Sequence, residues 1–460
     1  MSARHEGGVR VVLGYPNRYW VAMSNLGFQT VYKLFASEPR LNVERAFIPE
    51  ATDEGRQAEL STEIRTFESN RSLSESEILA LSVSFETDYP YVLSMLEAAG
   101  VKLDRCLETE RQSETAHEGN SDYQRPLIIG GGAALTLNPE PLANLFDVIV
   151  IGEGEEVISE ILATYLTARD ERVGFDETLR RLAQLEGVYV PRFYRAEYQP
   201  DGSIQRFHAF AGVPERVERR YLKDIDKFPS YTVIQTPNTE FRDMFMTETG
   251  RGCEVGCKFC VAGYMYRPTR KRSEEAVRET VQIGLERGKS VGFVGAAVSS
   301  HPAIAKLARG VAESGGRAAL SSIMSQRVTR ELAMSPSESE SKTVALAPEA
   351  GSETLRFRIG KRVCNEQILE AVGTLAESGI RNFKLYFIVG LPSEEMEDVE
   401  AIGRLVEQAK DVALERARKQ AEFKTAPFIY LSVNPFIPKA WTPFQRHEFL
   451  PFAEIKRRIA

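Results

Sequence analysis

Residues 250–273 read GRGCEVGCKFCVAGYMYRPTRKRS, a loop in which three cysteines follow one another with the spacing C-x3-C-x2-C. They are Cys253, Cys257 and Cys260. Gly252 and Gly256 stand on either side of the first cysteine, and glycines allow the backbone to wrap tightly around a ligand. The spacing therefore predicts three thiolates that face one centre.

The remaining cysteines and the histidines narrow the chemistry of this centre. The chain has only five cysteines in 460 residues, and this odd total argues against a disulfide framework and for metal or redox chemistry in a reducing compartment. A structural zinc normally takes four protein ligands, yet the nearest histidines, His208 and His301, are more than forty positions away. An iron–sulfur cluster held by three cysteines leaves one iron open for a cofactor or substrate. Cys106 and Cys364 are expected to be free thiols without a role.

Short apolar runs alternate with amphipathic stretches on the C-terminal side of the loop, and the loop itself directly follows the first of these runs. The predicted strands are 244–249, 290–295, 318–323, 343–348, 382–390 and 428–434. The predicted helices between them include 273–287, 302–314, 365–378 and 394–420, with Ser273 and Asn365 as N-terminal caps. Six βα units predict a partial TIM barrel, (β/α)6, whose active site lies at the carboxyl ends of the strands.

The N-terminal part shows a second alternation of strands and helices. The predicted strands are 9–14, 42–47, 78–84, 126–131 and 146–152, and helices are expected at 25–37, 89–99 and 155–167. This α/β pattern predicts a Rossmann-like, parallel, doubly wound sheet that binds ligands at the carboxyl ends of its strands. The polar stretch 106–124 is expected to be an exposed loop. We place this domain at 1–168, a linker with a β-hairpin at 169–238, and the barrel at 239–460.

Composition excludes several classes of protein. With 58 basic and 65 acidic side chains the net charge is −7, so there is no strong signal for nucleic-acid binding. No stretch has the eighteen or so uncharged apolar residues of a membrane span, and the first residues contain no long apolar segment like that of a signal peptide. The expected location is the cytoplasm.

The cysteine loop resembles the signature of the radical SAM family, which has an aromatic residue before the last cysteine, here Phe259. Further segments between about 236 and 445 are similar to the family's motifs. The resemblance assigns contacts with S-adenosylmethionine (SAM) to the glycine-rich turn Gly295, Ala296 and Ala297, to Ser325 and Arg327, to Glu349 in APEAGSETLR, and to Gly390 in the fifth-strand motif. Glu349 would meet the ribose or the amino end of SAM. Because GAAVSSHP carries no glutamate, backbone carbonyls are expected to contact the amine.

The resemblance implies an enzyme that binds a [4Fe-4S] cluster through Cys253, Cys257 and Cys260 and cleaves SAM reductively. A low-potential electron donor such as flavodoxin or ferredoxin would then be a partner. The alternative for Glu349 is a carboxylate without a functional role, either at the surface or at a helix cap. His301 is expected to start a helix rather than to act as a base, and the basic run 267–272 is either a solvated face or a site for an anionic substrate.

The N-terminal region resembles the cobalamin-binding-like domain of one subgroup of this family. The candidate cobalamin contacts are Ser82, Ser84, Gly130, Gly131 and Gly132. The Asp-x-His-x-x-Gly segment that would bring a histidine to cobalt is absent, and neither His5 nor His117 lies in such a context. Two interpretations stay open: cobalamin binds without a protein histidine, or the domain has kept its fold and lost its ligand. The alternative for the run Gly130 to Gly132 is a tight strand–helix turn without a ligand.

Cobalamin-dependent methylation is one use of such a protein. Two rival functions also stay open. Methylthiotransferases have a similar barrel, but they hold a second cluster with three more cysteines, whereas this N-terminal domain has only Cys106. The other rival is an iron–sulfur redox sensor or scaffold without catalysis. The substrate itself cannot be read from the sequence.

Overall fold

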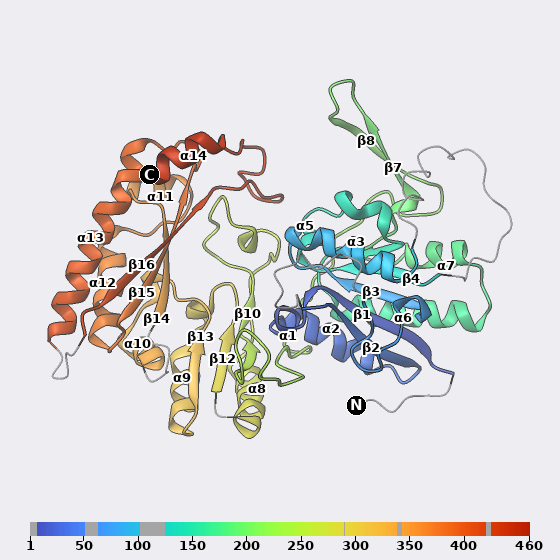
Figure 1. Ribbon diagram of the computed structural model, residues 1–460, viewed down its shortest axis with the longest axis horizontal. Coiled ribbons are helices and arrows are strands. Elements are labelled where there is room, and N and C mark those ends of the chain that lie inside the picture. Colours follow the sequence, from blue (N-terminus) through green and yellow to red (C-terminus); the bar gives the residue numbers. More distant parts are fainter. Residues whose placement is uncertain (1–6, 51–62, 102–124, 289, 338–342, 420–424) are drawn as a thin grey trace. The chain divides into compact units, whose positions relative to one another are not determined.

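The computed structural model describes residues 7–50, 63–101, 125–288, 290–337, 343–419 and 425–460 (Figure 1). The chain divides into two compact units, the first made of Met1–Lys223 with Thr236–Arg242 and the second of Asp224–Gln235 with Asp243–Ala460. The segment predicted as a linker therefore contributes to both units. Cys106 and the whole of the loop predicted at 106–124 lie outside the described residues.

The first unit is built on a six-stranded sheet with the order β2-β1-β3-β4-β5-β6. Its strands are β1 (Val9–Arg18), β2 (Leu41–Ile48), β3 (Ile78–Ser82), β4 (Leu127–Gly131), β5 (Val148–Val150) and β6 (Val188–Tyr189). The first five are parallel, as predicted, and β6 adds an antiparallel edge that the sequence did not reveal. The central strand β3 is almost wholly buried, because a doubly wound sheet is covered on both faces.

Helices of the first unit cover this sheet. They are α1 (Tyr19–Met23), α2 (Leu26–Ala36), α3 (Tyr89–Ala98), α5 (Ala133–Leu137), α6 (Gly154–Asp170) and α7 (Phe175–Leu182). Asn25 caps α2, since its side chain accepts the backbone N–H of Phe28 at 3.0 Å. The predicted Rossmann-like fold is confirmed. The predicted hairpin consists of β7 (Tyr194–Tyr198) and β8 (Ile204–Ala209) and projects from this unit (Figure 1).

The second unit contains the six parallel strands that the sequence predicts for a partial barrel. They are β9 (Phe245–Glu248), β12 (Ser290–Val294), β13 (Arg317–Leu320), β14 (Thr343–Glu349), β15 (Asn382–Val389) and β16 (Phe428–Pro435). In the described part of the chain they form two three-stranded sheets, β13-β12-β9 and β14-β15-β16, without a ladder between β13 and β14. The partial (β/α)6 barrel is thus confirmed, with an interruption in the middle of its wall.

Helices cover one face of these strands (Figure 1). They are α8 (Glu274–Arg287), α9 (Ile304–Glu313), α10 (Arg330–Ser337), α11 (Glu353–Arg358), α12 (Asn365–Glu377), α13 (Met396–Arg418) and α14 (Phe452–Ile459). Alternate residues of β15 are buried in one apolar core with α12 and α13, so its other residues, including Lys384 and Tyr386, face the barrel interior. No helix in the described ranges has the length and apolar character needed to cross a bilayer.

The first residues of α8 and α12 show whether the predicted N-terminal caps are present. Ser273 caps α8 as predicted, because its side chain accepts the N–H of Ala276 at 3.2 Å. The prediction for α12 is wrong by one residue. Cys364 takes the cap position there, and its N–H donates to Gln367 at 3.1 Å, while Asn365 is the first helical residue. The Asn365 side chain instead accepts a hydrogen bond from Arg356.

Candidate functional site

The cysteine loop lies at the carboxyl end of β9 and is closed at its base by a two-stranded ladder. β10 (Gly250–Arg251) pairs antiparallel with β11 (Arg270–Lys271). Gly252 has a φ of +79°, and a Cβ there would lie 2.8 Å from the carbonyl oxygen of Tyr266. Glycine is therefore required at the point where the chain turns into the loop. All three cysteines of the loop are free thiols.

The rest of the barrel holds this loop through backbone contacts and a small apolar core. The N–H of Lys258 donates to Ile359 at 2.8 Å, and the carbonyl of Lys258 accepts from Phe444 at 3.2 Å. Phe259 packs against a cluster at the ends of the second sheet, formed by Ala350, Leu355, Ile359, Leu391, Phe436 and Phe444. The loop is thus anchored to the segments that follow β14 and β16. The proposed contact of Phe259 with a cluster or an adenine stays a prediction.

The electrostatics of the thiols show that they share one environment. Burial raises the pKa of the Cys257 thiol to about 12, against the opposing effect of Lys361 and with further contributions from Cys260, Glu349 and Cys253. Burial also raises the pKa of Cys260. Two of the three sulfurs therefore carry protons at neutral pH in the metal-free protein, and metal binding would have to release them.

The donor set fits a cluster better than a single ion. A zinc ion needs four donors that converge at about 2.0–2.3 Å. Among the described residues, no group of three or more His, Cys, Asp or Glu side chains converges closely enough to hold one metal ion. In a cubane the three thiolates would bind three different irons, so they surround the cluster and need not converge on one point. Three thiols in one loop, of which Cys257 is buried and the other two are partly buried, match this requirement.

Glu349 lies beside the cysteines and forms a partly buried ion pair that sequence reasoning missed. Lys361 Nζ lies 3.2 Å from Glu349 Oε1, and the two side chains are 19% and 16% exposed. Burial raises the pKa of Glu349, and the ammonium of Lys361 opposes this rise. The role of Glu349 in the site stays a prediction. The alternative, a surface or capping carboxylate, does not describe this partly buried pair. The only sequence signal for Lys361 was a Gly-Lys pair after a short helix.

The backbone at Glu349 is unusual. Its φ is +72°, and the pairing of β14 with β15 shifts register between Leu346 and Glu349. A non-glycine residue in this region carries backbone strain, which is often concentrated at functional sites. The wholly buried Arg356 supports the following turn, since it donates to the carbonyls of Ala350 and Gly351 at 2.9 Å. Nothing in the sequence distinguished this arginine from an ordinary helix surface residue.

The predicted contacts after the second and third strands approach the cysteine loop. Arg327, in a 3-10 turn that begins at Ser325, forms an ion pair of 3.7 Å with Glu254, the residue after the first cysteine. The carbonyl of Gly295 accepts from Ser322 at 3.3 Å, and the carbonyl of Ala297 accepts from Ser300 at 2.8 Å. Both carbonyls thus have protein donors already. Their contacts with SAM, and the contact of Ala296, stay predictions.

Gly390 ends the fifth strand of the barrel, β15. Its N–H donates to Glu394 at 2.7 Å, and Glu394 forms an ion pair with Arg458 of α14. A Cβ on Gly390 would lie 3.0 Å from the side chain of Leu450. Gly390 therefore has a structural role of its own, and its contact with adenine stays a prediction.

Comparison with known proteins identifies the family. A model described as "Radical SAM superfamily" matches residues 247–406, and one described as "Radical SAM proteins, N-terminal" matches residues 27–191. The chain thus carries a radical SAM domain at residues 247–406. This domain implies a [4Fe-4S] cluster and SAM as cofactors, in agreement with the resemblance of the cysteine loop.

The individual proteins that this radical SAM chain resembles have low sequence identity to it. An uncharacterized protein of Methanocaldococcus jannaschii is 28% identical over 329 residues, which cover 70% of this chain and 62% of that protein. Two structures of the cobalamin-dependent S-adenosylmethionine radical enzyme OxsB, one with aqua-cobalamin and SAM bound and one with aqua-cobalamin, superpose with TM-scores of 0.55 and 0.53 at 13% identity. Each match covers 98% of this chain and 61% of OxsB. The chain thus spans about three fifths of the length of these relatives. At 13% identity, the similarity to OxsB indicates a shared fold and nothing more.

The candidate cobalamin residues of the radical SAM chain lie at the ends of β3 and β4. Gly132 has a φ of +107°, and a Cβ there would lie 2.4 Å from the carbonyl oxygen of Val83. A Cβ on Gly130 would lie 2.7 Å from Leu135 and 2.8 Å from Phe146. Packing within the unit therefore explains both glycines, so the glycine run no longer argues for cobalamin. The roles of Ser82, Ser84 and Gly131 in cobalamin binding stay predictions.

Gly132→Ala is expected to lower the free energy of unfolding by about 2 kcal/mol, because the added Cβ collides with backbone that cannot move away easily. Gly131→Ala is the matched control, since the nearest atom to its Cβ would be Val150 at 3.7 Å, an ordinary contact. Urea unfolding followed by circular dichroism measures both variants. Equal stability of the two would contradict the close approach at Gly132.

Several side chains of the basic run 267–272 form hydrogen bonds and ion pairs within the barrel unit. Arg267 donates to Gly263 at 2.7 Å and lies over the ring of Tyr264 at 4.4 Å. Lys271 donates to the carbonyl of Ser300 at 2.8 Å, and the buried Arg272 pairs with Glu248. These contacts favour a clamp on the cysteine loop over either a solvated face or a site for an anionic substrate.

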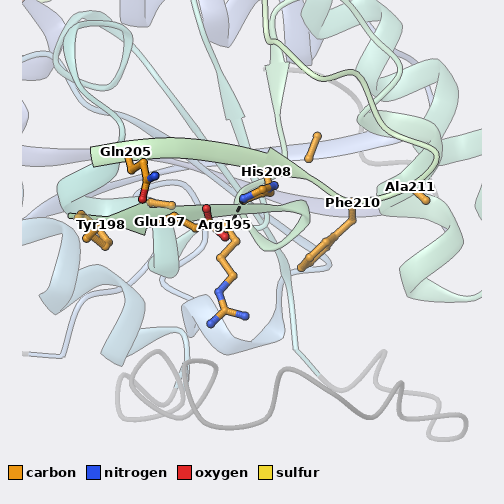
Figure 2. A pocket seen from close by; sticks show the side chains of 9 residues that line it. Arg195, Glu197, Tyr198, Gln205, His208, Phe210 and Ala211 are labelled. Carbon is orange, nitrogen blue, oxygen red and sulfur yellow. Dashed lines mark ion pairs between the residues drawn. The ribbon is translucent and has the colours of Figure 1, made fainter. Parts of the chain in front are cut away.

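Two histidines, His301 and His208, form contacts within the described part of the protein. His301 is 4% exposed, and its ring contacts the N–H of Ala303 at 3.2 Å and the carbonyl of Arg272 at 2.8 Å, consistent with a residue that starts a helix. A hollow on the β7–β8 hairpin contains an ion pair of 2.8 Å between His208 and Glu197 (Figure 2). None of the predicted site residues lines this hollow.

Proposed function

We propose that this chain is a radical SAM enzyme that holds a [4Fe-4S] cluster with Cys253, Cys257 and Cys260 and reductively cleaves SAM. The observation that supports this most is the group of three free thiols at the carboxyl end of β9, in one electrostatic environment with Glu349 and Lys361. The three cysteines would hold the cluster, which would supply the one electron needed to cleave SAM to methionine and a 5′-deoxyadenosyl radical able to take a hydrogen atom from the substrate. The electron comes from a low-potential donor of the flavodoxin or ferredoxin class.

The Glu349–Lys361 pair is suited to the methionine part of SAM, which is a zwitterion. The carboxylate of Glu349 can accept from the ammonium or the ribose hydroxyls, while the ammonium of Lys361 can pair with the SAM carboxylate. Lys361 Nζ and Glu349 Oε1 lie 3.2 Å apart, so each of the two charges has the other as its partner within the protein. Gly295, Ala296, Ala297, Ser325, Arg327, Gly390 and Phe259 are the further proposed contacts.

The first unit is proposed to bind cobalamin, which would allow methyl transfer to an unactivated carbon. Support comes from the fold that this chain shares with cobalamin-dependent OxsB. In the described part of the first unit the one histidine, His208, lies in the β7–β8 hairpin and not at a strand end of the sheet. We therefore propose cobalamin binding without a histidine ligand from the described residues. His5 and His117 lie outside them. We further propose that the protein works in the cytoplasm.

Anaerobic reconstitution with iron and sulfide tests the proposal. The reduced protein is expected to show a paramagnetic cluster signal that changes on addition of SAM, and to form 5′-deoxyadenosine when dithionite or flavodoxin is present. A cluster that yields no 5′-deoxyadenosine would support the redox sensor or scaffold instead. Titration with hydroxocobalamin tests the methylation branch separately, and a corrinoid spectrum unchanged by the protein would remove that branch alone.

A further inference from the structure

A small polar cluster lies at the carboxyl edge of the first sheet, where parallel sheets bind ligands. Its members come from β1, the start of α2 and the segment after β3: Tyr15, Asn17, Asn25, Ser84 and Asp88. The amide nitrogen of Asn25 donates to Ser84 Oγ at 3.1 Å, and that of Asn17 donates to Asp88 Oδ1 at 2.8 Å. Asn25 also donates to Tyr15 Oη at 3.4 Å, so these contacts join Tyr15, Asn25 and Ser84 in one group and Asn17 with Asp88 in another.

The second oxygen of Asp88 is the unusual feature of this cluster. Asp88 is 1% exposed, and Oδ2 has no hydrogen-bond partner among the described residues. A buried carboxylate oxygen without a donor is destabilising, and such groups in native proteins usually have a partner. The backbone at Phe85 and the amide of Asn17 favour the charged form of this carboxyl, but no donor of the described residues meets Oδ2 itself. A donor on a bound molecule would satisfy this oxygen.

The position of Asp88 makes a ligand the natural source of this donor. Asp88 ends a 3-10 turn, Glu86–Asp88, and the residues just before it, Phe85, Glu86 and Thr87, are exposed. For a ligand at the carboxyl edge of β1 and β3 to reach the carboxylate, this exposed turn would have to move aside. Ser84 Oγ accepts from Asn25 and also lies within hydrogen-bond reach of Tyr15, so its own hydrogen can turn from Tyr15 to a ligand carbonyl.

We propose that Asp88 and Ser84 form a binding site for a primary carboxamide of the corrin ring, with the amide N–H₂ on Asp88 Oδ2 and the amide carbonyl on the Ser84 hydroxyl. The inference rests on the proposed cobalamin binding and adds the residues that recognise the cofactor. A carboxamide fits because it presents a donor and an acceptor side by side, opposite a carboxylate and a hydroxyl. The corrin ring carries several such amides on its rim.

Binding of hydroxocobalamin and of its three isomeric monocarboxylic acids tests the assignment by absorbance titration. In each acid one propionamide of the ring has become a carboxylate. The full chain is expected to bind one of the three acids at least about tenfold more weakly than hydroxocobalamin, because that carboxylate faces Asp88. Asp88→Asn is expected to bind hydroxocobalamin about tenfold more weakly and to lose the discrimination, because the new amide can donate to the carboxylate.

Glu97→Gln serves as the matched control, since Glu97 is an exposed acid on the following helix, α3. It is expected to bind all four corrinoids as the unchanged chain does. Burial raises the pKa of Asp88, so its carboxylate costs stability as the pH rises through the folded-state pKa. Asp88→Asn should therefore melt at a higher temperature than the unchanged chain at pH 7, with a smaller difference at pH 4, which verifies that the variant is folded.

Three results would overturn the assignment. If Asp88→Asn retains both the affinity and the discrimination of the unchanged chain, Oδ2 holds an internal water and the site is elsewhere. If Glu97→Gln shows the same losses as Asp88→Asn, the effect is one of net charge. If the unchanged chain binds no corrinoid, the cobalamin branch of the proposed function fails together with this site, whereas cluster assembly and SAM cleavage are unaffected.

Discussion

Cys257→Ala is expected to leave the reconstituted protein without its cluster and to lower 5′-deoxyadenosine formation by more than about 1,000-fold. Cys257 is the most buried thiol of the loop at 8% exposure, and the other two thiols cannot bind three irons. The iron content should fall from about four atoms per chain to near zero. Iron and sulfide analysis, with visible absorbance, measures the loss directly and independently of any substrate.

Cys364→Ala is the matched control for this experiment. Cys364 is also a partly buried free thiol, but it caps α12 and does not belong to the cysteine loop. The variant is expected to assemble a full cluster and to lose only a small part of its stability. A Cys257→Ala protein that retains the cluster, or a Cys364→Ala protein that loses it, would show that the loop is not the site of cluster binding.

Lys361→Met is expected to weaken SAM binding by about 10- to 100-fold, because the SAM carboxylate loses its counter-charge. The variant also leaves Glu349 buried without its partner, so the pKa of Glu349 rises further. Since an acid with a raised folded-state pKa costs stability as the pH rises through that pKa, the variant should be less stable at pH 8 than at pH 5 relative to the unchanged chain. Equilibrium dialysis and thermal melts at both pH values measure these effects.

The double variant Lys361→Met with Glu349→Gln separates stability from binding. Removal of both charges should restore most of the thermal stability at pH 8, since no unpaired carboxylate remains, but SAM affinity should stay low. Arg362→Met is the matched control, because Arg362 is the adjacent cation and is exposed. Unchanged SAM affinity in Lys361→Met would show that the ion pair has only a structural role.

Local patterns were enough to predict much of the fold. The fifth barrel strand was predicted at 382–390 and is observed as Asn382–Val389, because alternating burial has a period that neighbouring residues reveal. Ser273 was recognised as a cap for the same reason, since a cap depends on the next three residues. The cysteine spacing is likewise local, and the family match confirms the assignment that it suggested.

Other features depend on distances between residues that are far apart in the chain. The lack of a ladder between β13 and β14 in the described chain depends on the closure of the whole barrel wall, which no single strand sequence encodes. The edge strand β6 is only two residues long and takes its conformation from β5, about forty positions earlier. Such short elements carry too little local signal to be predicted, because their neighbours in space determine them.

The sequence by itself determined that three thiols lie in one loop after a barrel strand and that two α/β units follow one another. The tertiary structure decided which side chains accompany those thiols: it paired Glu349 with Lys361, and it engaged the basic run in contacts around the loop. It also showed that Gly130 and Gly132 serve packing, while Asp88 keeps an oxygen without a donor among the described residues. The reason is physical: charge pairing, desolvation and close packing depend on distances in space, which the linear order of residues does not contain.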